Sequence, residues 1–250
     1  MKYALCIESI FSKLPFAERL AATRAAGYNA IEVWGVDDDR RKLLSAATAE
    51  GLEVAMIIGA GGLTTRDPAA VARNLEGLRR NIEVAHALNC PNVCLFVGDR
   101  DESAIYATQR AAVIDFLGQS AELLAGSGIT GIVESLNCKD HPTCFLLTMA
   151  DAVAIIDEVD RPEIKLQFDI YHTALTDPDV ESLIAANIKK IAYFQAADAP
   201  SRAEPGTGEL DYRTITRQIR DTGFQGYFSW EFWPRAEATE AITAARNVQQ

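Results

Sequence analysis

Short apolar runs alternate along this chain with segments of helical periodicity. Runs of strand length lie at residues 2–8, 30–34, 52–58, 92–97 and 129–133, and three more end at Asp169, Gln195 and Glu231. Between them the apolar spacing changes to steps of three and four, as at Val71, Leu75, Leu78, Ile82 and Ala85, which is typical of an amphipathic helix. Eight strand–helix alternations without a Pro- or Gly-rich linker predict one α/β domain over residues 1–250.

Local signals place several helix ends. Pro15 is expected in the first turn of a helix, and Asp67-Pro68 forms an N-cap followed by proline. Thr148, with Asp151 three residues later, resembles a capping box. Further helices are expected at residues 37–50, 102–124, from Asp211 to Gly223 and from Ala236 onward. Residues 59–62 are interpreted as a glycine-containing loop after the third strand.

Two architectures fit eight strand–helix units, a closed (β/α)8 barrel and an open doubly wound sheet. The units share 250 residues evenly, which favours the (β/α)8 TIM barrel. The active site of such a barrel lies at the carboxyl ends of its strands. The polar residues found at those ends are therefore the first candidates for chemistry.

Four oxygen-bearing side chains occupy such strand ends: Glu134, Asp169, Gln195 and Glu231. For any one of them alone, a structural hydrogen bond or ion pair is the better explanation. Four at matching positions favour a metal site instead, because buried carboxylates need partners. Three carboxylates and an amide oxygen suit Mg²⁺ or Mn²⁺ better than zinc or copper.

Other polar residues near the strand ends are candidates for substrate binding: His172, Arg202, Lys139, Asp140 and Glu32. His172 is expected at the start of a loop after Asp169. For Arg202, an ion pair inside its own acidic loop is the competing interpretation, and Lys139 and Asp140 fit solvated loop charges equally well. Neither common phosphate-binding glycine motif is present, so we expect an unphosphorylated substrate.

Charge and cysteine content exclude other classes of protein. The formal net charge of −11 argues against a nucleic-acid binder, which would carry a basic stripe. Five scattered cysteines without a C-x-x-C pair predict reduced thiols in a cytoplasmic protein. The apolar runs are too short for a signal peptide or a membrane span. The sequence is compatible with a homo-oligomer.

Four segments carry a resemblance to a known family: residues 132–142, 166–172, 195–212 and 226–234. In this order they resemble the hydroxypyruvate isomerase family, which belongs to the xylose isomerase-like barrels together with ketose 3-epimerases and endonuclease-IV-type repair enzymes. The resemblance spans most of the chain. Departures at Ser135, at Thr143-Cys144 and in residues 59–66 leave the substrate open between a short keto-acid and a ketose.

The resemblance implies a metal-dependent isomerase of a small hydroxy-carbonyl compound that works by proton transfer through a metal-held enediolate. It implies that Glu134, Asp169, Gln195 and Glu231 hold a divalent metal, Mn or Mg. Glu134 and Glu231 would also be the proton-transfer pair, with His172 and Arg202 near the substrate. A ketose 3-epimerase is the first alternative. A lyase, a nuclease and a non-catalytic sugar-binding barrel rank below it.

Overall fold

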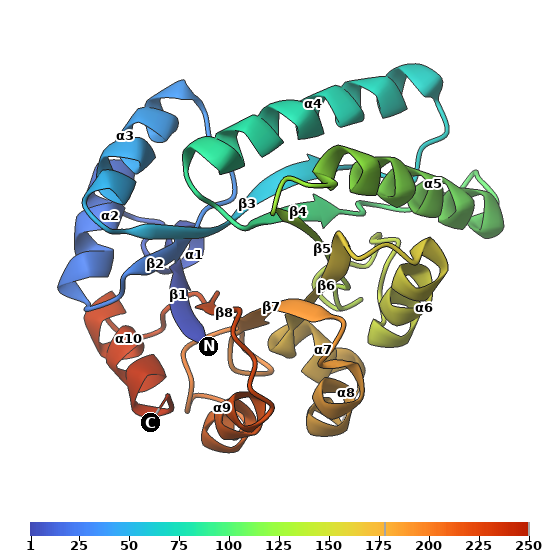
Figure 1. Ribbon diagram of the computed structural model, residues 1–250. Coiled ribbons are helices and arrows are strands. Elements are labelled where there is room, and N and C mark those ends of the chain that lie inside the picture. Colours follow the sequence, from blue (N-terminus) through green and yellow to red (C-terminus); the bar gives the residue numbers. More distant parts are fainter. Residues whose placement is uncertain (178, 250) are drawn as a thin grey trace.

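Eight parallel strands form a closed barrel in the order of the sequence (Figure 1). The computed structural model describes residues 1–177 and 179–249. The strands are β1 (Lys2–Cys6), β2 (Ala30–Glu32), β3 (Glu53–Gly61), β4 (Asn92–Phe96), β5 (Thr130–Glu134), β6 (Ile164–Asp169), β7 (Ile191–Ala196) and β8 (Tyr227–Trp230). Pairing of β1 with β8 closes the ring and places Tyr3 opposite Phe228. The predicted (β/α)8 barrel is therefore confirmed.

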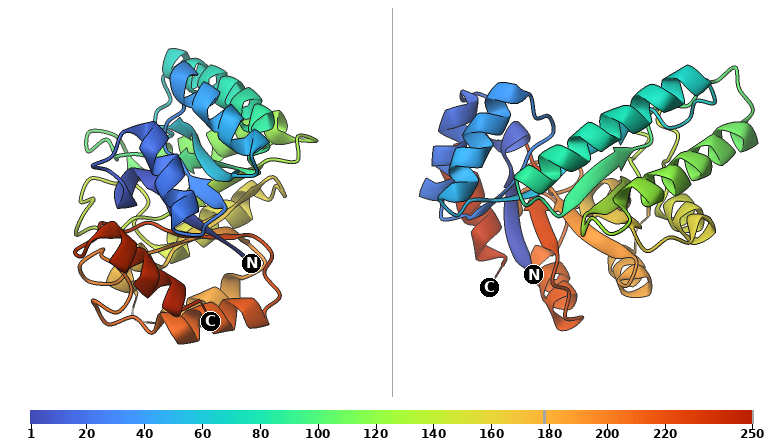
Figure 2. Two further views of the ribbon diagram at one scale, coloured as in Figure 1. Left: turned by 90° about the vertical axis from the view of Figure 1, so that its left-hand side faces the viewer. Right: turned by 45° about the horizontal axis from the view of Figure 1, so that its top comes forward.

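Helices surround the barrel on the outside, and α10 lies beside α2 where the ring closes (Figures 1 and 2). They are α1 (Ile7–Ile10), α2 (Phe16–Ala25), α3 (Asp38–Ala49), α4 (Pro68–Ala87), α5 (Tyr106–Leu124), α6 (Met149–Val159), α7 (Ile170–Thr176), α8 (Val180–Asn187), α9 (Tyr212–Asp221) and α10 (Ala238–Asn247). Within the described residues, no helix combines the length and the apolar composition needed to cross a membrane.

The predicted helix starts are largely confirmed. Asp67 accepts hydrogen bonds from the first backbone N–H groups of α4, and Thr148 accepts one from Asp151 at the start of α6. Asp211 caps α9 in the same way. Pro15 is the residue before α2, one position earlier than expected.

Two local predictions are wrong. Strand β3 continues through Gly59 to Gly61, where a loop was expected, because pairing with β4 carries the strand past the glycines. Residues 7–8 were assigned to the first strand, but Ile7 begins the short helix α1. Both errors concern strand ends, which depend on the neighbouring strand more than on local sequence.

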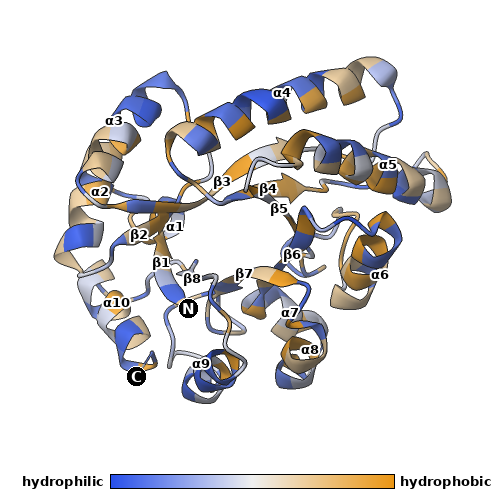
Figure 3. Cartoon of the chain, in the orientation of Figure 1, coloured by the Kyte–Doolittle hydropathy of each residue, from blue (hydrophilic) through white to orange (hydrophobic). Residues whose placement is uncertain are grey.

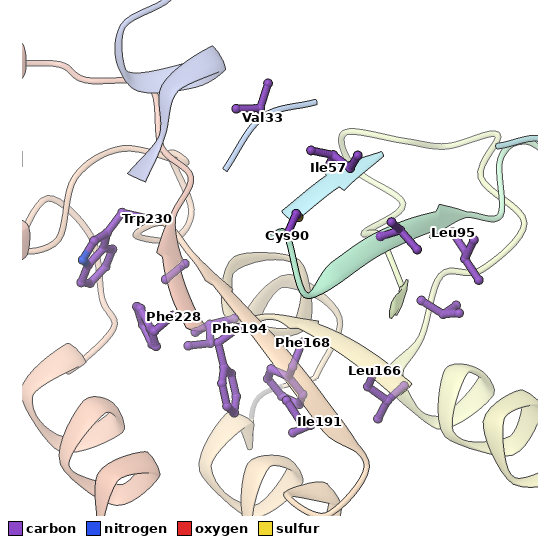
Figure 4. Packing of buried hydrophobic residues seen from close by; sticks show 14 of the residues in the cluster. Val33, Ile57, Cys90, Leu95, Leu166, Phe168, Ile191, Phe194, Phe228 and Trp230 are labelled. Carbon is purple, nitrogen blue, oxygen red and sulfur yellow. The ribbon is translucent and has the colours of Figure 1, made fainter. Parts of the chain in front are cut away.

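Outward-facing strand residues pack against the helices and form the main core. Phe168, Phe194, Phe228 and Trp230 make a row of aromatic contacts across β6, β7 and β8, with ring centroids 5.0 to 6.2 Å apart (Figure 4). The helices turn apolar faces to the barrel and polar faces outward (Figure 3). Because side chains alternate along a strand, the residue after each outward aromatic points into the barrel. This alternation directs Asp169, Gln195 and Glu231 inward.

Small residues occupy many of the inward positions lower in the barrel. Ala4, Ala30 and Ala55 belong to a second buried cluster together with Tyr193 and Tyr227. This layer fills the barrel interior, as in other barrels of this size. The polar residues at the carboxyl ends of the strands lie above it.

Candidate active site

The four predicted strand-end residues are brought to the same end of the barrel. Glu134 and Asp169 are the last residues of β5 and β6, Gln195 lies in β7, and Glu231 directly follows β8. The register pairs Asp169 with Gln195. Glu134, Gln195 and Glu231 line a cavity of about 440 Å³. Ligand atoms of Glu134, Asp169 and His172 lie within 4.8 Å of one another, close enough to share a cation.

Asp169 has two distinct roles at this point of the chain. Its Oδ1 accepts hydrogen bonds from the backbone N–H groups of Tyr171 (2.7 Å) and His172 (3.2 Å), so it caps helix α7. Its Oδ2 lies 3.7 Å from His172 Nε2 and 4.0 Å from Arg202 Nη2. Oδ1 therefore caps α7, and Oδ2 remains available as a ligand atom on the polar side of the site.

His172 lies in the first turn of α7 and not in a loop, so that prediction is wrong. The Asp169 cap starts a helix directly at the strand end, without an intervening loop. Burial lowers the pKa of His172 to about 4, so the ring is neutral at pH 7. Its Nδ1 accepts from the backbone N–H of Asn137 at 3.2 Å, which places the hydrogen on Nε2. Among the described residues Nε2 has no hydrogen-bond partner, so it can donate to a substrate oxygen.

Arg202 reaches across from the loop after β7 and pairs with Glu231, with 2.7 Å between Nη2 and Oε2. Its guanidinium lies 4.8 Å from the ring centroid of Trp233 and 5.2 Å from that of Tyr171. The competing interpretation, an ion pair inside its own loop, is wrong. In that loop Asp198 accepts from the backbone N–H groups of residues 206, 208 and 210, and Glu204 accepts from those of residues 235 and 236.

The carboxylates repel one another and are poorly hydrated. Burial raises the pKa of Glu231 to about 8, although Arg202 acts in the opposite direction. Burial and then the charges of Asp169 and Glu231 raise the pKa of Glu134 well above its usual range. The guanidinium of Arg202 leaves this concentration of negative charge incompletely balanced. The donor set fits a divalent cation, which would supply the missing positive charge.

Lys139 and Asp140 have partners within the loops above the barrel. Lys139 Nζ donates to the carbonyl oxygen of Pro200 at 3.0 Å. Asp140 Oδ2 accepts from the hydroxyl of Tyr171 at 2.6 Å and from Asn137 Nδ2 at 3.1 Å. Their role in substrate binding stays a prediction, and these contacts show that they also order the loop after β5.

Glu32 contacts the amide nitrogen of Gln195 and is fully buried. Its Oε1 accepts from Gln195 Nε2 at 2.7 Å and from Trp34 Nε1 at 3.3 Å, and its Oε2 accepts from the Tyr193 hydroxyl at 3.0 Å. A ligand atom of Glu32 also lies within 4.8 Å of one of Glu231 and of Cys6. The expected direct contact of Glu32 with substrate stays a prediction, whereas its contact with Gln195 is present in the structure.

The sequence interpretation missed other residues that line the cavity. These are Trp34, Met56, Ile58, Cys94, Phe96, Leu136, His141, Gln167 and Trp233. Gln167 could have been found, because it precedes Asp169 by two residues and must point to the same side of β6. The same argument applies to Trp34 after Glu32 and to Trp233 after Glu231. For His141, whose ring lies 5.5 Å from that of His172, the sequence holds no such periodic signal.

Comparison with known proteins agrees with this geometry. A family model described as the xylose isomerase-like TIM barrel matches residues 20–248. The chain is 30% identical to a putative hydroxypyruvate isomerase of Mus musculus, over 99% of this chain and 95% of the relative. It is 29% identical to a 2-oxo-tetronate isomerase of Cupriavidus necator, over 96% of each chain.

Solved structures show the same fold at lower sequence identity. A family 2 AP endonuclease from Brucella melitensis has a TM-score of 0.91 at 23% identity, over 98% of both chains. A 3-keto-D-glucoside 4-epimerase from E. coli has a TM-score of 0.85 at 20% identity, over 100% of this chain and 99% of the other. The chain belongs to the xylose isomerase-like TIM barrels and, within them, to the hydroxypyruvate isomerase family.

Proposed function

We propose that this enzyme is a metal-dependent isomerase of a small, unphosphorylated hydroxy-carbonyl compound. The observation that carries the proposal is that Glu134, Gln195 and Glu231 line one cavity, with Asp169 beside Glu134 and with Arg202 paired to Glu231. Glu134, Asp169, Gln195 and Glu231 would hold a divalent ion, Mn²⁺ or Mg²⁺. When bound, that ion supplies Lewis-acid polarisation of the carbonyl, which makes the neighbouring C–H more acidic.

Glu134 and Glu231 are suited to move the proton. They come from β5 and β8, which are separated in the ring by β6 and β7, so they approach the cavity from different sides. One carboxylate removes the proton from carbon, and the other returns a proton to the planar enediolate. His172 Nε2–H and the Arg202 guanidinium are the donors available to hold the substrate oxygens during this transfer.

A short keto-acid is the first candidate substrate. Two relatives named as isomerases of hydroxypyruvate and of 2-oxo-tetronate align over nearly the whole chain. Arg202 provides the positive charge that a substrate carboxylate would need. We therefore place hydroxypyruvate and 2-oxo-tetronate first among the compounds to be tested.

A free ketose is the second candidate, and the apolar part of the cavity lining favours it. Trp34, Ile58, Phe96 and Trp233 form an apolar side, and the last three are 37 to 41% exposed. A volume of about 440 Å³ is large for a three-carbon acid. Apolar and aromatic side chains suit the C–H faces of a longer neutral chain, which would make the enzyme a 3-epimerase.

Solvent isotope exchange separates these functions. Metal-stripped protein is supplied with Mn²⁺ in D₂O and incubated with hydroxypyruvate, 2-oxo-tetronate or free ketoses. We expect deuterium at the carbon next to the carbonyl of the true substrate, and loss of exchange both in EDTA and in the Glu134→Gln variant. A product that has lost water relative to the substrate would identify a lyase. Absence of exchange with every compound would contradict the proposed proton transfer.

A further inference from the structure

The side-chain amide of Gln195 is held at both of its ends. Nε2 donates to Glu32 Oε1 at 2.7 Å, and Oε1 accepts a hydrogen bond from Gln167 Nε2. All three side chains are at most 2% exposed. Glu32 comes from β2 and Gln167 from β6, so two separate strands fix one amide group on β7.

The direction of this amide decides whether Gln195 can act as a ligand. The oxygen and nitrogen ends of an amide have nearly the same shape, and neighbouring donors and acceptors determine which end points where. Only the oxygen end can bind a cation. A glutamine without oriented neighbours would present its NH₂ group to the cation site for part of the time.

Glu32 acts as a hydrogen-bond acceptor at the oxygen that contacts Gln195. Its Oε1 also receives the indole N–H of Trp34, a group that can only donate. Its Oε2 receives the hydroxyl of Tyr193. The Trp34 contact thus makes Oε1 an acceptor, and only the NH₂ end of Gln195 can face this oxygen.

A buried carboxylate is costly unless it is hydrogen-bonded, and an apolar residue could fill the same space. We infer that Glu32 and Gln167 are positioning residues that orient the Gln195 amide so that its oxygen faces the cation site. Gln167 occupies one lone pair of that oxygen and leaves the second free. This inference rests on the proposed function, because it concerns the same metal site.

The test measures Mn²⁺ affinity by calorimetry on metal-stripped protein, without substrate. In Glu32→Met the acceptor for the NH₂ end of Gln195 is removed, so the amide of Gln195 loses its preferred direction. We expect Mn²⁺ affinity to fall about 10–100-fold, the usual effect of removing a partner of a metal ligand. Tyr193→Phe is the matched control. It removes a donor from the other oxygen of Glu32 and leaves the Gln195 contact intact, so affinity should stay within about threefold of wild type.

The conservative variant gives an independent test. In Glu32→Gln the Trp34 indole N–H selects the oxygen end of the new amide at the point where Gln195 Nε2 donates, so Gln195 keeps its direction. Glu32→Gln and Glu32→Met lose the same charge, so Mn²⁺ affinity in Glu32→Gln should stay at least about threefold above that of Glu32→Met. Circular dichroism of each variant confirms that it is folded.

The outcomes separate this inference from the proposed function. Unchanged Mn²⁺ affinity in folded Glu32→Met, or an equal loss in Glu32→Met and Glu32→Gln, overturns the orienting role. If Glu32→Met does not fold, Gln167→Met decides, because it removes the donor at the other end of the amide. A loss of at least threefold supports the inference, and a smaller loss overturns it. Wild-type protein that binds no Mn²⁺ overturns the metal site itself, and this inference with it.

Discussion

Arg202 pairs with Glu231 at the mouth of the barrel, with Nη2 2.7 Å from Oε2. The two residues follow neighbouring strands, β7 and β8, and the backbone N–H of Trp233 donates to the Arg202 carbonyl oxygen at 3.0 Å. The Glu231 side chain is 6% exposed and that of Arg202 is 18% exposed. The guanidinium therefore provides a positive charge to a buried carboxylate where we propose that a cation binds.

Replacing Arg202 should make the protein more dependent on metal. Arg202→Met keeps the length of the side chain but leaves Glu231 without its charge partner. Removing one partner of a buried pair costs about 3–5 kcal/mol, and partial exposure of Arg202 reduces the expected loss to about 2–3 kcal/mol. Saturating Mn²⁺ should restore more stability in this variant than in wild type, because the cation replaces the lost charge.

Thermal unfolding with EDTA or with Mn²⁺ measures both effects. Arg66→Met is the matched control, because Arg66 forms a 2.9 Å pair with Asp115 in which both side chains are more than half exposed. We expect this control to change stability by at most about 1 kcal/mol with either additive. Equal stabilisation by Mn²⁺ in Arg202→Met and wild type would contradict the prediction.

Stability of the metal-free protein should decrease as pH rises from 5 to 9. The pKa of Glu134 is raised well above its usual range, and that of Glu231 is raised to about 8. A carboxyl group with a raised folded-state pKa stabilises the fold while it is protonated, and this contribution is lost as pH rises through the folded-state pKa. Melting temperatures in EDTA across this range test the direction. Glu231→Gln should show a weaker dependence on pH, and an unchanged slope would assign the effect to other groups.

Amide substitutions should separate metal binding from proton transfer. Glutamine keeps an oxygen ligand but cannot accept a proton at neutral pH. Glu134→Gln and Glu231→Gln should bind Mn²⁺ more weakly and lose about 10²–10⁴-fold in turnover even at saturating metal. Asp169→Asn keeps an oxygen to cap α7, and its activity should recover substantially at high Mn²⁺. Near wild-type turnover of either glutamine variant in excess Mn²⁺ would show that the glutamate is only a ligand.

The apolar wall should determine which substrates are accepted. Phe96→Asn removes an aromatic face that is 37% exposed, so its effect on stability should be small. If a ketose is the substrate, kcat/KM for it should fall about tenfold, since burying a large apolar group contributes about 1.5–3 kcal/mol. A short keto-acid that does not reach this wall should be converted at nearly the wild-type rate. Leu43→Asn, at a position of similar exposure on α3, is the control.

Much of the fold follows from local sequence. Caps such as Asp67 and Thr148 and the apolar steps of four and three mark helices, because helix formation depends on residues three and four positions apart. Strand alternation also accounts for the candidate ligands. Phe168 packs outward, so Asp169 points inward, and Phe194 and Gln195 repeat this pattern on the next strand.

Tertiary structure alone decided how these residues are paired. The hydrogen bond from Gln195 to Glu32 joins positions 163 residues apart, and the register of the closed barrel brings them together. The same holds for the extension of β3 through Gly61 and for the partner of Arg202. The sequence by itself determined which side chains face the interior, since that depends on neighbours along one strand. Their contacts required the closed barrel, because each partner comes from a different strand or loop.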